Sequence, residues 1–319
     1  MQTRRPAFKV IDGVRRCVAV EPEFLKEGLK FRAKNGDLVQ TTFPKNGTHW
    51  ILYIMHLILR EGDPIPTYEE FAKEWRFLEY MNIKEFSSSL PLRTFVTHMP
   101  LDKHSMTKEG KYVYIARNPW DVCVSFYHMA TNMSTFEFQD GSFEDFIDTF
   151  VGGDFGYGDY FEHVAASYAL REEPNMFFVT YEELKRNTRE VALRLAYFLG
   201  EKYGRDLEKD DTLLQKLLER SQPDYMRSVV VADMSGKGNP QWNEVLSRRK
   251  ITCKEGHEGD KNKYCYVRIG KVGSWKSYFT PDLLRKMENR ILEAEKKSSF
   301  MDLWKDIRAE AIERIQKDE

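Results

Sequence analysis

One short segment restricts the fold of this chain more than any other, because it joins a buried strand pattern to a helix through a polar turn. A run of apolar and β-branched residues begins at Leu38, breaks at Phe43 and resumes with helical spacing after Thr48. A strand that turns sharply into a helix directs unpaired backbone N–H groups and the positive end of the helix dipole toward one point. Gly47 allows the turn, Thr48 can cap the helix, and Lys45 adds a positive charge. The segment therefore predicts an anion-binding site, although the nucleotide loop G-x-x-x-x-G-K-[ST] is absent.

Three motifs, in order along the chain, resemble those of the cytosolic sulfotransferases. The first, similar to the family's 5′-phosphosulfate loop, is Pro44-Lys45-x-Gly47-Thr48-x-Trp50. The second, YVYIARNPWDVCVSFYH at 112–128, looks like the 3′-phosphate segment, and the third, RIGKVGSWK at 268–276, resembles the element R-K-G-x-x-G-D-W-K. The resemblance covers about residues 22–280. It implies a sulfotransferase that moves a sulfuryl group from 3′-phosphoadenosine 5′-phosphosulfate (PAPS) to an acceptor hydroxyl or amine.

The order of apolar segments predicts an α/β fold. Strand patterns at 38–43, 94–98, 111–116 and 176–180 alternate with helical patterns at 48–60, 68–75, 119–130, 143–150, 160–171 and 189–199. We expect one domain over residues 1–319, with a central parallel sheet flanked by helices and a P-loop-like phosphosulfate-binding loop. Residues 1–21 form an N-terminal extension in this interpretation. Residues 235–262, rich in Gly, Lys, Asn and Glu, are interpreted as a lid rather than a disordered loop.

Composition limits the partners that this chain can have. Its 319 residues, 41% hydrophobic and 31% charged, are enough for a large core. A net charge of −1 gives no general attraction to nucleic acid or to an anionic membrane, so we expect neither as a partner. The basic N-terminal segment lacks the apolar core of a secretory signal, and no apolar run approaches the ~20 residues of a membrane span. We therefore expect a cytoplasmic enzyme, unlike the membrane-anchored Golgi sulfotransferases.

The second motif also has a physical interpretation of its own. Arg117 ends a predicted buried strand, so its guanidinium reaches the carboxyl edge of the sheet and can hold a phosphate through two hydrogen bonds. Asp121 and Ser125 follow on one helix face. An Arg117–Asp121 ion pair at the helix start is the alternative that these residues leave open. The resemblance assigns the 3′-phosphate to five residues, Arg117, Ser125, Arg268, Ile269 and Gly270.

The resemblance also assigns the rest of the nucleotide site. The 5′-phosphate belongs to the turn, through Lys45, Asn46, Gly47, Thr48 and His49. His49 replaces a threonine that the family often has, and it either contacts the phosphate when protonated or points away. The adenine belongs to Trp50, Tyr181, Ser221 and Met226. Two positions depart from the family: Ile269 replaces a lysine, and Pro223 replaces an aromatic residue that commonly stacks on the base, a loss for which Tyr225 could compensate.

Catalysis requires a base for the acceptor hydroxyl. His98 ends the strand pattern TFVTH and matches the family's catalytic histidine in its T-H-x-P-L segment. Without that match, a histidine at a strand end is more often structural. An imidazole with an ordinary pKa near 6.5 accepts a proton at neutral pH. Many relatives have lysine two residues earlier, where this chain has Val96. Lys45 is the expected catalytic cation, since it can stabilise the charge that develops on the leaving bridging oxygen.

Aromatic residues cluster where the family builds its acceptor pocket. They include Phe77, Tyr80 and several residues of the segment 143–160. Aromatic walls favour phenols or other flat hydroxylated compounds. Three acidic residues could pair with the ammonium group of a phenolic amine: Glu79, Glu137 and Asp140. The sequence leaves phenol, biogenic amine and hydroxysteroid or other alcohol open as acceptors.

The sequence predicts no metal site. Cys253, His257 and Cys265 lie close together, but their spacing fits no zinc pattern and a fourth ligand is missing. A sulfuryl group carries less charge than a phosphoryl group and needs no magnesium. The expected partners are therefore PAPS, as co-substrate, and a small hydroxylated acceptor.

Two other classes of protein stay open on the sequence alone. A small-molecule kinase would share the strand–loop–helix unit, but it needs a Gly-Lys-[ST] loop and a carboxylate for magnesium. An inactive nucleotide-binding module would result if the departures at Val96, Ile269 and Pro223 disable the site. A homodimer is possible, although the family's dimer motif K-x-x-x-T-V-x-x-x-E is degraded here to Lys276 and Thr280.

Overall fold

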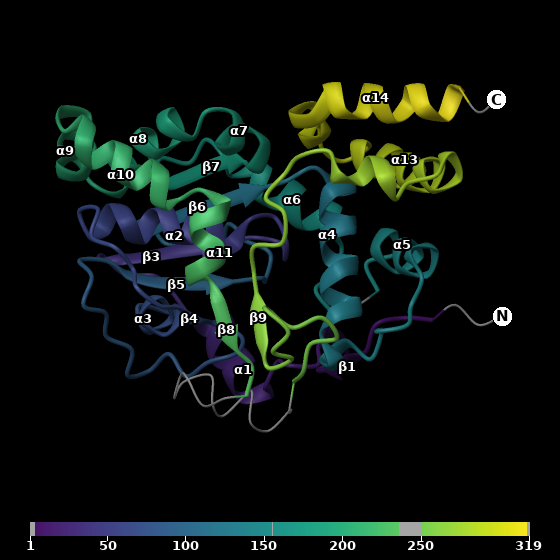
Figure 1. The fold of residues 1–319 in the computed structure, drawn as a ribbon, viewed down its shortest axis with the longest axis horizontal. Helices are drawn as coiled ribbons and strands as arrows, with labels where there is room; N and C mark the ends of the chain where they lie inside the picture. Colours follow the sequence, from purple (N-terminus) through teal and green to yellow (C-terminus); the bar gives the residue numbers. More distant parts are fainter. Residues whose placement is uncertain (1–3, 155, 236–250, 318–319) are drawn as a thin grey trace.

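A five-stranded parallel sheet forms the centre of the molecule (Figure 1). The computed structural model describes residues 4–154, 156–235 and 251–317. The strands lie in the order β4 (Trp75–Phe77), β5 (Arg93–Thr97), β3 (Asp37–Thr41), β6 (Lys111–Ala116) and β7 (Met176–Thr180), and every neighbouring pair is parallel. All residues of β3 are buried, as in a strand covered on both faces. The predicted α/β fold is confirmed, and four of these strands match predicted ones within two residues at each end.

Helices follow the strands and cover the sheet. Their bounds are α1 (Pro22–Lys30), α2 (Thr48–Leu59), α3 (Tyr68–Lys73), α4 (Pro119–Asn132), α5 (Phe143–Val151), α6 (Tyr160–Ala169), α7 (Tyr181–Arg186), α8 (Thr188–Leu199), α9 (Glu201–Lys209), α10 (Asp211–Arg220), α11 (Pro223–Val229), α13 (Pro281–Glu295) and α14 (Lys305–Gln316). Short 3₁₀ turns occur at Ser134–Phe136, Ser274–Ser277 and Phe300–Trp304. The six predicted helices correspond to α2, α3, α4, α5, α6 and α8, with ends that differ by at most two residues.

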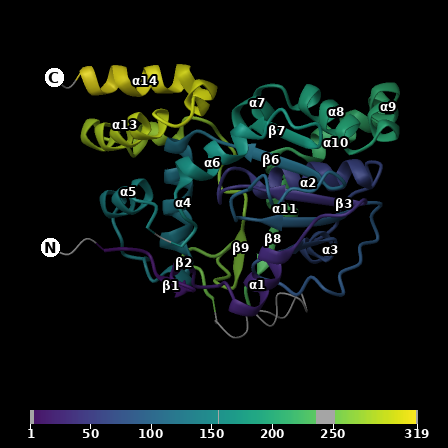
Figure 2. The ribbon, with the colours of Figure 1, turned by 180° about the vertical axis from the view of Figure 1, so that it is seen from behind.

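The helices form two groups, which Figure 1 and the reverse view in Figure 2 both show. In one group α2 packs against α8 and α10, and α8 contacts β7. In the other, α4 packs against α5, while α13 contacts α5, α6 and α14. Among the described residues, none of the helices combines the length and the apolar character that crossing a membrane would require.

Strand β4 corrects the prediction of a helix over 68–75. The helix α3 ends at Lys73, and Trp75 begins a strand that pairs with β5. All three residues of β4 are buried. A strand of three buried residues has no alternation that could distinguish it from the end of a helix, so the sequence pattern could not reveal it.

The N-terminal extension contains a hairpin that the sequence analysis did not predict. Strands β1 (Phe8–Ile11) and β2 (Val14–Cys17) are joined by Asp12 and Gly13, both with positive φ, as a two-residue hairpin turn requires. The N–H of Cys17 donates to the carbonyl of Gly156 at 2.8 Å, which ties the hairpin to the loop before α6. A second antiparallel pair, β8 (Val231–Asp233) and β9 (Lys263–Cys265), brackets residues 234–262.

Candidate active site

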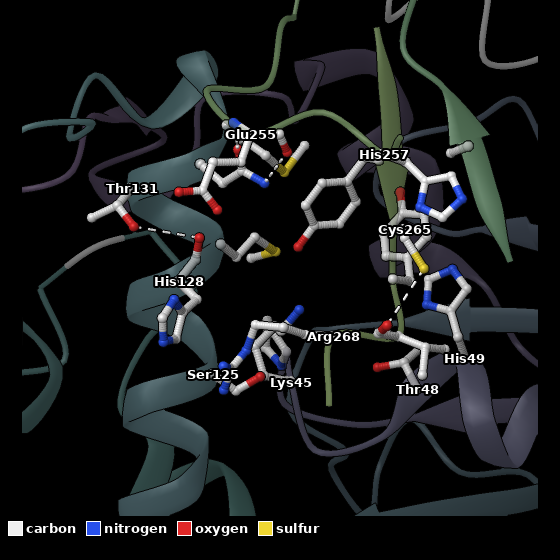
Figure 3. Close-up of a pocket in the computed structure, with 18 of the residues that line it drawn as sticks. Lys45, Thr48, His49, Ser125, His128, Thr131, Glu255, His257, Cys265 and Arg268 are labelled. Atoms are coloured by element: carbon white, nitrogen blue, oxygen red, sulfur yellow. Dashed lines mark hydrogen bonds between the residues drawn. The ribbon is translucent and has the colours of Figure 1, made fainter. Parts of the chain in front are cut away.

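A cavity of about 930 Å³ opens where the strands of the sheet end. Its walls come from the β3–α2 loop, the end of β5, the helix α4 and the segment 264–274. Figure 3 shows Lys45, Ser125 and Arg268 close together on one side of this cavity and Glu255 on the opposite side. Because parallel strands end at the same edge of a sheet, residues far apart in the sequence meet here.

The β3–α2 loop has the backbone geometry of an anion-binding turn. Gly47 is in the left-handed region with φ of 116°, and Lys45 has φ of 72°. A Cβ atom at position 47 would lie 2.9 Å from the ring of Tyr181, so only glycine fits. The side chain of Asn46 donates to the carbonyl of Ile115 at 3.2 Å. Asn46 therefore holds the loop against β6, and its buried side chain is not part of the cavity wall.

Three cations line the cavity near this loop: Lys45, Arg117 and Arg268. Burial, together with the charges of Arg268 and Arg117, lowers the pKa of Lys45 to about 7. Burial is also the main cause of a lowered pKa at Arg268. Within the described part of the chain, neither Lys45 nor Arg268 forms an ion pair with a carboxylate. Uncompensated positive charge of this kind favours a polyanionic ligand.

Arg117 is held by several contacts at once. Its guanidinium lies over the ring of Tyr181, with the central carbon 4.3 Å from the ring centroid. One terminal nitrogen donates to the carbonyl of Lys271 at 3.0 Å and lies 3.7 Å from the carboxylate of Asp121. The ion pair with Asp121, which the sequence left as an alternative, therefore exists, yet Arg117 still lines the cavity and its Nε atom has no described hydrogen-bond partner.

Asp121 has a structural role that the sequence analysis missed. Its fully buried carboxylate accepts hydrogen bonds from the N–H of Gly273 at 2.8 Å, the hydroxyl of Ser274 at 2.9 Å and the N–H of Trp275 at 3.1 Å. It also accepts one from Asn118 at 3.0 Å. The first turn of α4 thus anchors the third sequence motif, so that Arg268, Ile269 and Gly270 lie beside Arg117 in the cavity wall.

The predicted adenine residues divide into two sets. Trp50, Tyr181 and Met226 line the cavity, and the rings of Trp50 and Tyr181 lie 4.9 Å apart, edge to face. Ser221 is fully buried and is not in the wall. Its hydroxyl donates to the carbonyl of Leu218, and its own carbonyl accepts the indole N–H of Trp50 at 3.0 Å. Ser221 therefore positions Trp50.

His98 presents one ring nitrogen to the cavity. Its Nδ1 atom lies 2.8 Å from the carbonyl of Thr42, an arrangement in which Nδ1–H donates and Nε2 is left as the acceptor. The ring also packs against Phe77, with 5.1 Å between centroids. Burial, and to a lesser degree the charge of Lys45, lowers the pKa of His98 to about 4, although the bond to Thr42 opposes this. The imidazole is therefore neutral at pH 7.

The ring of His49 is held by two tyrosines. Its ring stacks on Tyr266 with 3.9 Å between centroids, and its Nε2 atom lies 3.3 Å from the hydroxyl of Tyr68. Burial, followed by the charge of Lys45, lowers its pKa to about 3. His49 is therefore neutral at pH 7, and its part in binding a phosphate stays a prediction.

The part of the cavity around His98 is aromatic. Phe77 and Tyr80 line it as predicted, and the hydroxyl of Tyr80 donates to that of Tyr157 at 3.3 Å. Elsewhere in the cavity, wall residues that were not predicted from the sequence include Cys17, His128, Met129, Met133, Phe136, Tyr264 and Tyr266. The position of His128, three residues after Ser125 on α4, was a signal that could have revealed it.

The three acidic candidates for an amine do not share one place. Asp140 lines the cavity, but it lies 3.9 Å from Lys254. Glu137 is exposed and Glu79 is buried, and neither is part of the cavity wall. Glu255, which the sequence analysis did not select, lines the cavity instead.

The predicted lid is described only in part, because residues 236–250 lie outside the described ranges. The described part, from Ile251, is anchored more firmly than its composition indicated. Ile251 and Cys253 are buried, and the backbone of Cys253 forms a β-bridge with Met133 after the end of α4. Lys254 and Glu255 line the cavity. Among the described residues no group of three or more metal-ligating side chains occurs.

The sequence of this chain is similar to those of known proteins. The chain matches the family model of the sulfotransferase domain over residues 35–299. It is 30% identical to 3-beta-hydroxysteroid sulfotransferase of Cavia porcellus over 272 residues, which cover 82% of this chain and 85% of the relative. It is 28% identical to Sulfotransferase 1E1 of Homo sapiens over 280 residues, which cover 85% and 87%.

Two solved structures share the fold. Mouse sulfotransferase SULT7A1 complexed with PAP has a TM-score of 0.69 and 22% identity, over 94% of this chain and 99% of that one. A retinol dehydratase in complex with androsterone and the inactive cofactor PAP has a TM-score of 0.66 and 22% identity, over 88% of both chains. The central sheet and its helices are therefore a known architecture.

Replacing Asp121 by alanine tests its role as an anchor. We expect the free energy of unfolding to fall by about 3–5 kcal/mol, because buried hydrogen-bond donors and Arg117 lose their acceptor. Urea-induced unfolding measures the change. Asp282→Ala is the control, since Asp282 is exposed and its ion pair among the described residues is with Arg285 in the same helix, and its loss should stay within about 1 kcal/mol. Equal effects of the two substitutions would contradict the anchoring role.

Proposed function

The chain belongs to the sulfotransferase family, and we propose that it transfers the sulfuryl group of PAPS to a hydroxyl group of a small acceptor, most simply a phenol or a phenolic amine. One observation carries the proposal: a cluster of three cations and a neutral imidazole line the same cavity. The cations suit a donor with phosphate and sulfate groups, and the imidazole suits an acceptor that must lose a proton.

The residues present fit the proposed co-substrate. Lys45 and the N–H groups of the β3–α2 loop would hold the 5′-phosphosulfate, and Arg117, Ser125 and Arg268 would hold the 3′-phosphate. The edge-to-face rings of Trp50 and Tyr181 offer an aromatic surface for the adenine. When bound, PAPS supplies an activated sulfuryl group and a leaving group whose negative charge these cations stabilise.

His98 would act as the general base. Its Nδ1–H is engaged by Thr42, so Nε2 is the atom that can accept the proton of the acceptor hydroxyl. Lys45 would stabilise the negative charge that develops on the departing bridging oxygen. Val96 stands where many relatives have a lysine, and we propose that this departure tunes the site rather than disabling it.

The aromatic wall supports a flat acceptor. Phe77, Tyr80 and Tyr157 surround the imidazole side of the cavity, and aromatic faces pack well on a phenol ring. A hydroxysteroid or another alcohol is the second candidate, because a relative with 30% identity is named a 3-beta-hydroxysteroid sulfotransferase. We also propose that the enzyme works in the cytoplasm as one domain. A homodimer would need contacts other than the degraded family motif.

One assay separates the proposed activity from the other classes. Incubation with radiolabelled PAPS and separate panels of phenols, phenolic amines and hydroxysteroids should yield labelled sulfate esters, while labelled ATP should yield no phosphorylated product. A kinase would give the reverse result. An inactive nucleotide-binding module would give neither product, yet would still bind adenosine 3′,5′-bisphosphate in isothermal titration.

Replacing His98 by alanine should lower turnover by about 10²–10⁴-fold, because the acceptor loses its base. The affinity for adenosine 3′,5′-bisphosphate should change only a few-fold, since His98 is on the acceptor side. A turnover assay and isothermal titration measure the two quantities. His104→Ala, at an exposed histidine outside the cavity wall, is the control. Unchanged turnover in the His98 variant would refute its role as the base.

Replacing Arg117 or Arg268 by alanine should weaken PAPS binding on the order of 10–100-fold, because charge-assisted hydrogen bonds worth roughly 1.5–3 kcal/mol are lost. The loss should vanish for adenosine 5′-phosphosulfate, which has no 3′-phosphate. Isothermal titration with the two ligands measures the difference. Equal weakening for both ligands would mean that these arginines are structural and that the 3′-phosphate binds elsewhere.

The lowered pKa of Lys45 predicts a pH dependence of nucleotide binding. Above pH 7 the free protein loses the Lys45 proton, while the bound anion favours the charged form, so binding takes up a proton. The Kd of adenosine 3′,5′-bisphosphate should therefore rise with pH between about 7.5 and 9, by at most about tenfold per pH unit. Isothermal titration in buffers of different ionisation enthalpy measures the proton uptake. Lys45→Met should bind more weakly and remove this dependence; if the dependence persists in that variant, another group is responsible.

A further inference from the structure

A buried carboxyl group lies directly behind the proposed base. Glu79 follows β4 and is only 3% exposed. Its Oε1 atom accepts the backbone N–H of His98 at 2.7 Å. Its Oε2 atom is buried without a hydrogen-bond partner among the described residues. Burying a carboxyl oxygen without a hydrogen-bond partner costs free energy.

The backbone and ring of His98 are fixed on three sides. Glu79 accepts the N–H, and the carbonyl of Thr42 accepts the ring Nδ1–H. The carbonyl of His98 lies 3.2 Å from the Nε2 atom of His163, whose other ring nitrogen lies 2.9 Å from the hydroxyl of Tyr114. Of these three contacts to His98, the one from Glu79 comes from an ionisable acid. Glu79 alone can therefore bring a negative charge to this residue.

The surroundings of Glu79 leave its carboxyl group about half ionised near pH 7. Burial raises the pKa of Glu79 to about 7, while the hydrogen bond from the His98 N–H, the nearby hydroxyl of Thr97 and the charge of Arg16 on β2 oppose this. Tyr80 and Tyr157 are titratable groups that interact with Glu79, and Cys17 in turn interacts with both tyrosines. Burial holds the pKa of both tyrosines well above their usual value. Glu79 is thus the acid of this cluster that changes charge near neutral pH.

We propose that Glu79 is a positioning residue for His98, which fixes the backbone of the base through its N–H and, when ionised, adds a negative charge that stabilises the imidazolium. The proposal rests on the proposed function, in which His98 Nε2 takes the acceptor proton. That proton passes from the acceptor oxygen to Nε2 and later to solvent, and Glu79 does not take it up. The charge of Lys45 disfavours the protonated imidazole, and a carboxylate at Glu79 would favour it.

Two substitutions separate the hydrogen bond from the charge. Glu79→Gln keeps an oxygen for the His98 N–H but cannot ionise, whereas Glu79→Asp keeps the charge but is one methylene too short to keep the 2.7 Å contact. Glu74→Gln is the matched control, because Glu74 lies at the other end of β4 and its carboxylate accepts from Ser88 and Ser89, outside the cavity wall. Each variant is assayed for kcat and for the acceptor KM from pH 6 to 9, and for the Kd of adenosine 3′,5′-bisphosphate.

The wild-type kcat should rise through pH 7 as Glu79 ionises. In Glu79→Gln this rise should be absent. If the Glu79 carboxylate raises the pKa of His98 by about one unit, kcat should be lower by about tenfold at pH 8, where Glu79 is ionised in the wild type. At pH 6, where Glu79 is mostly protonated, kcat should be lower by less than twofold. In Glu79→Asp kcat should fall at every pH while the rise remains. The Kd of the nucleotide should stay within about twofold in both. Glu74→Gln should keep the pH profile of the wild type. If Glu79→Gln also keeps that profile, the proposal is overturned.

A measurement on the wild type alone keeps the test valid if a variant does not fold. The carbon-13 resonance of the His98 Cε1 atom should show, besides its own titration, a second inflection near pH 7 from Glu79. Absence of this inflection in the wild type would also overturn the proposal. If the wild type transfers no sulfuryl group but the inflection is present, the proposed function fails while the coupling between Glu79 and His98 stands.

Discussion

The crowding of Lys45, Arg117 and Arg268 in one cavity is the constraint on which the site depends. Like charges held in a partly dry space repel, and the lowered pKa of Lys45 expresses that repulsion together with burial. The fold must supply the free energy that keeps the cations together. It does so with Asp121, whose buried carboxylate ties the start of α4 to the segment carrying Arg268. A polyanionic ligand would relieve this repulsion, so the repulsion in the free protein would contribute to the free energy of binding.

The same cations, together with burial, determine the protonation state of the histidines around them. Positive charge nearby disfavours protonation, and Lys45 adds to burial in lowering the pKa of His49 and His98. Burial, with the charges of Arg268 and Lys45, lowers the pKa of His128 to about 4. These rings are therefore neutral at pH 7 and act as hydrogen-bond partners, as His128 does for Tyr278 at 2.7 Å. In His98 the carbonyl of Thr42 engages Nδ1–H, which leaves Nε2 as a hydrogen-bond acceptor.

The sequence predicted the parts of the site that are local in the chain. The turn at Lys45 and Gly47 and the strand end at His98 each lie within a few residues of the pattern that identifies them. It could not predict contacts that depend on how distant segments meet. The hydrogen bond from the Gly273 N–H to Asp121 spans 152 residues. The stack of His49 on Tyr266 likewise joins two segments whose separation in sequence gives no sign of contact. Ser221 was assigned to the nucleotide but serves Trp50, a distinction that only side-chain geometry reveals.

The electrostatics of the cavity also imply an order of events under the proposed function. In the free protein, burial and the charge of Lys45 make His98 a weak base, with a pKa of about 4. Bound PAPS would neutralise Lys45 and its neighbours with phosphate and sulfate charge, which removes one cause of that low pKa and adds negative charge nearby. The imidazole would then hold a proton more readily. Proton transfer from the acceptor is thus favoured only when the sulfuryl donor is in place, because the donor itself supplies the charge that the base requires.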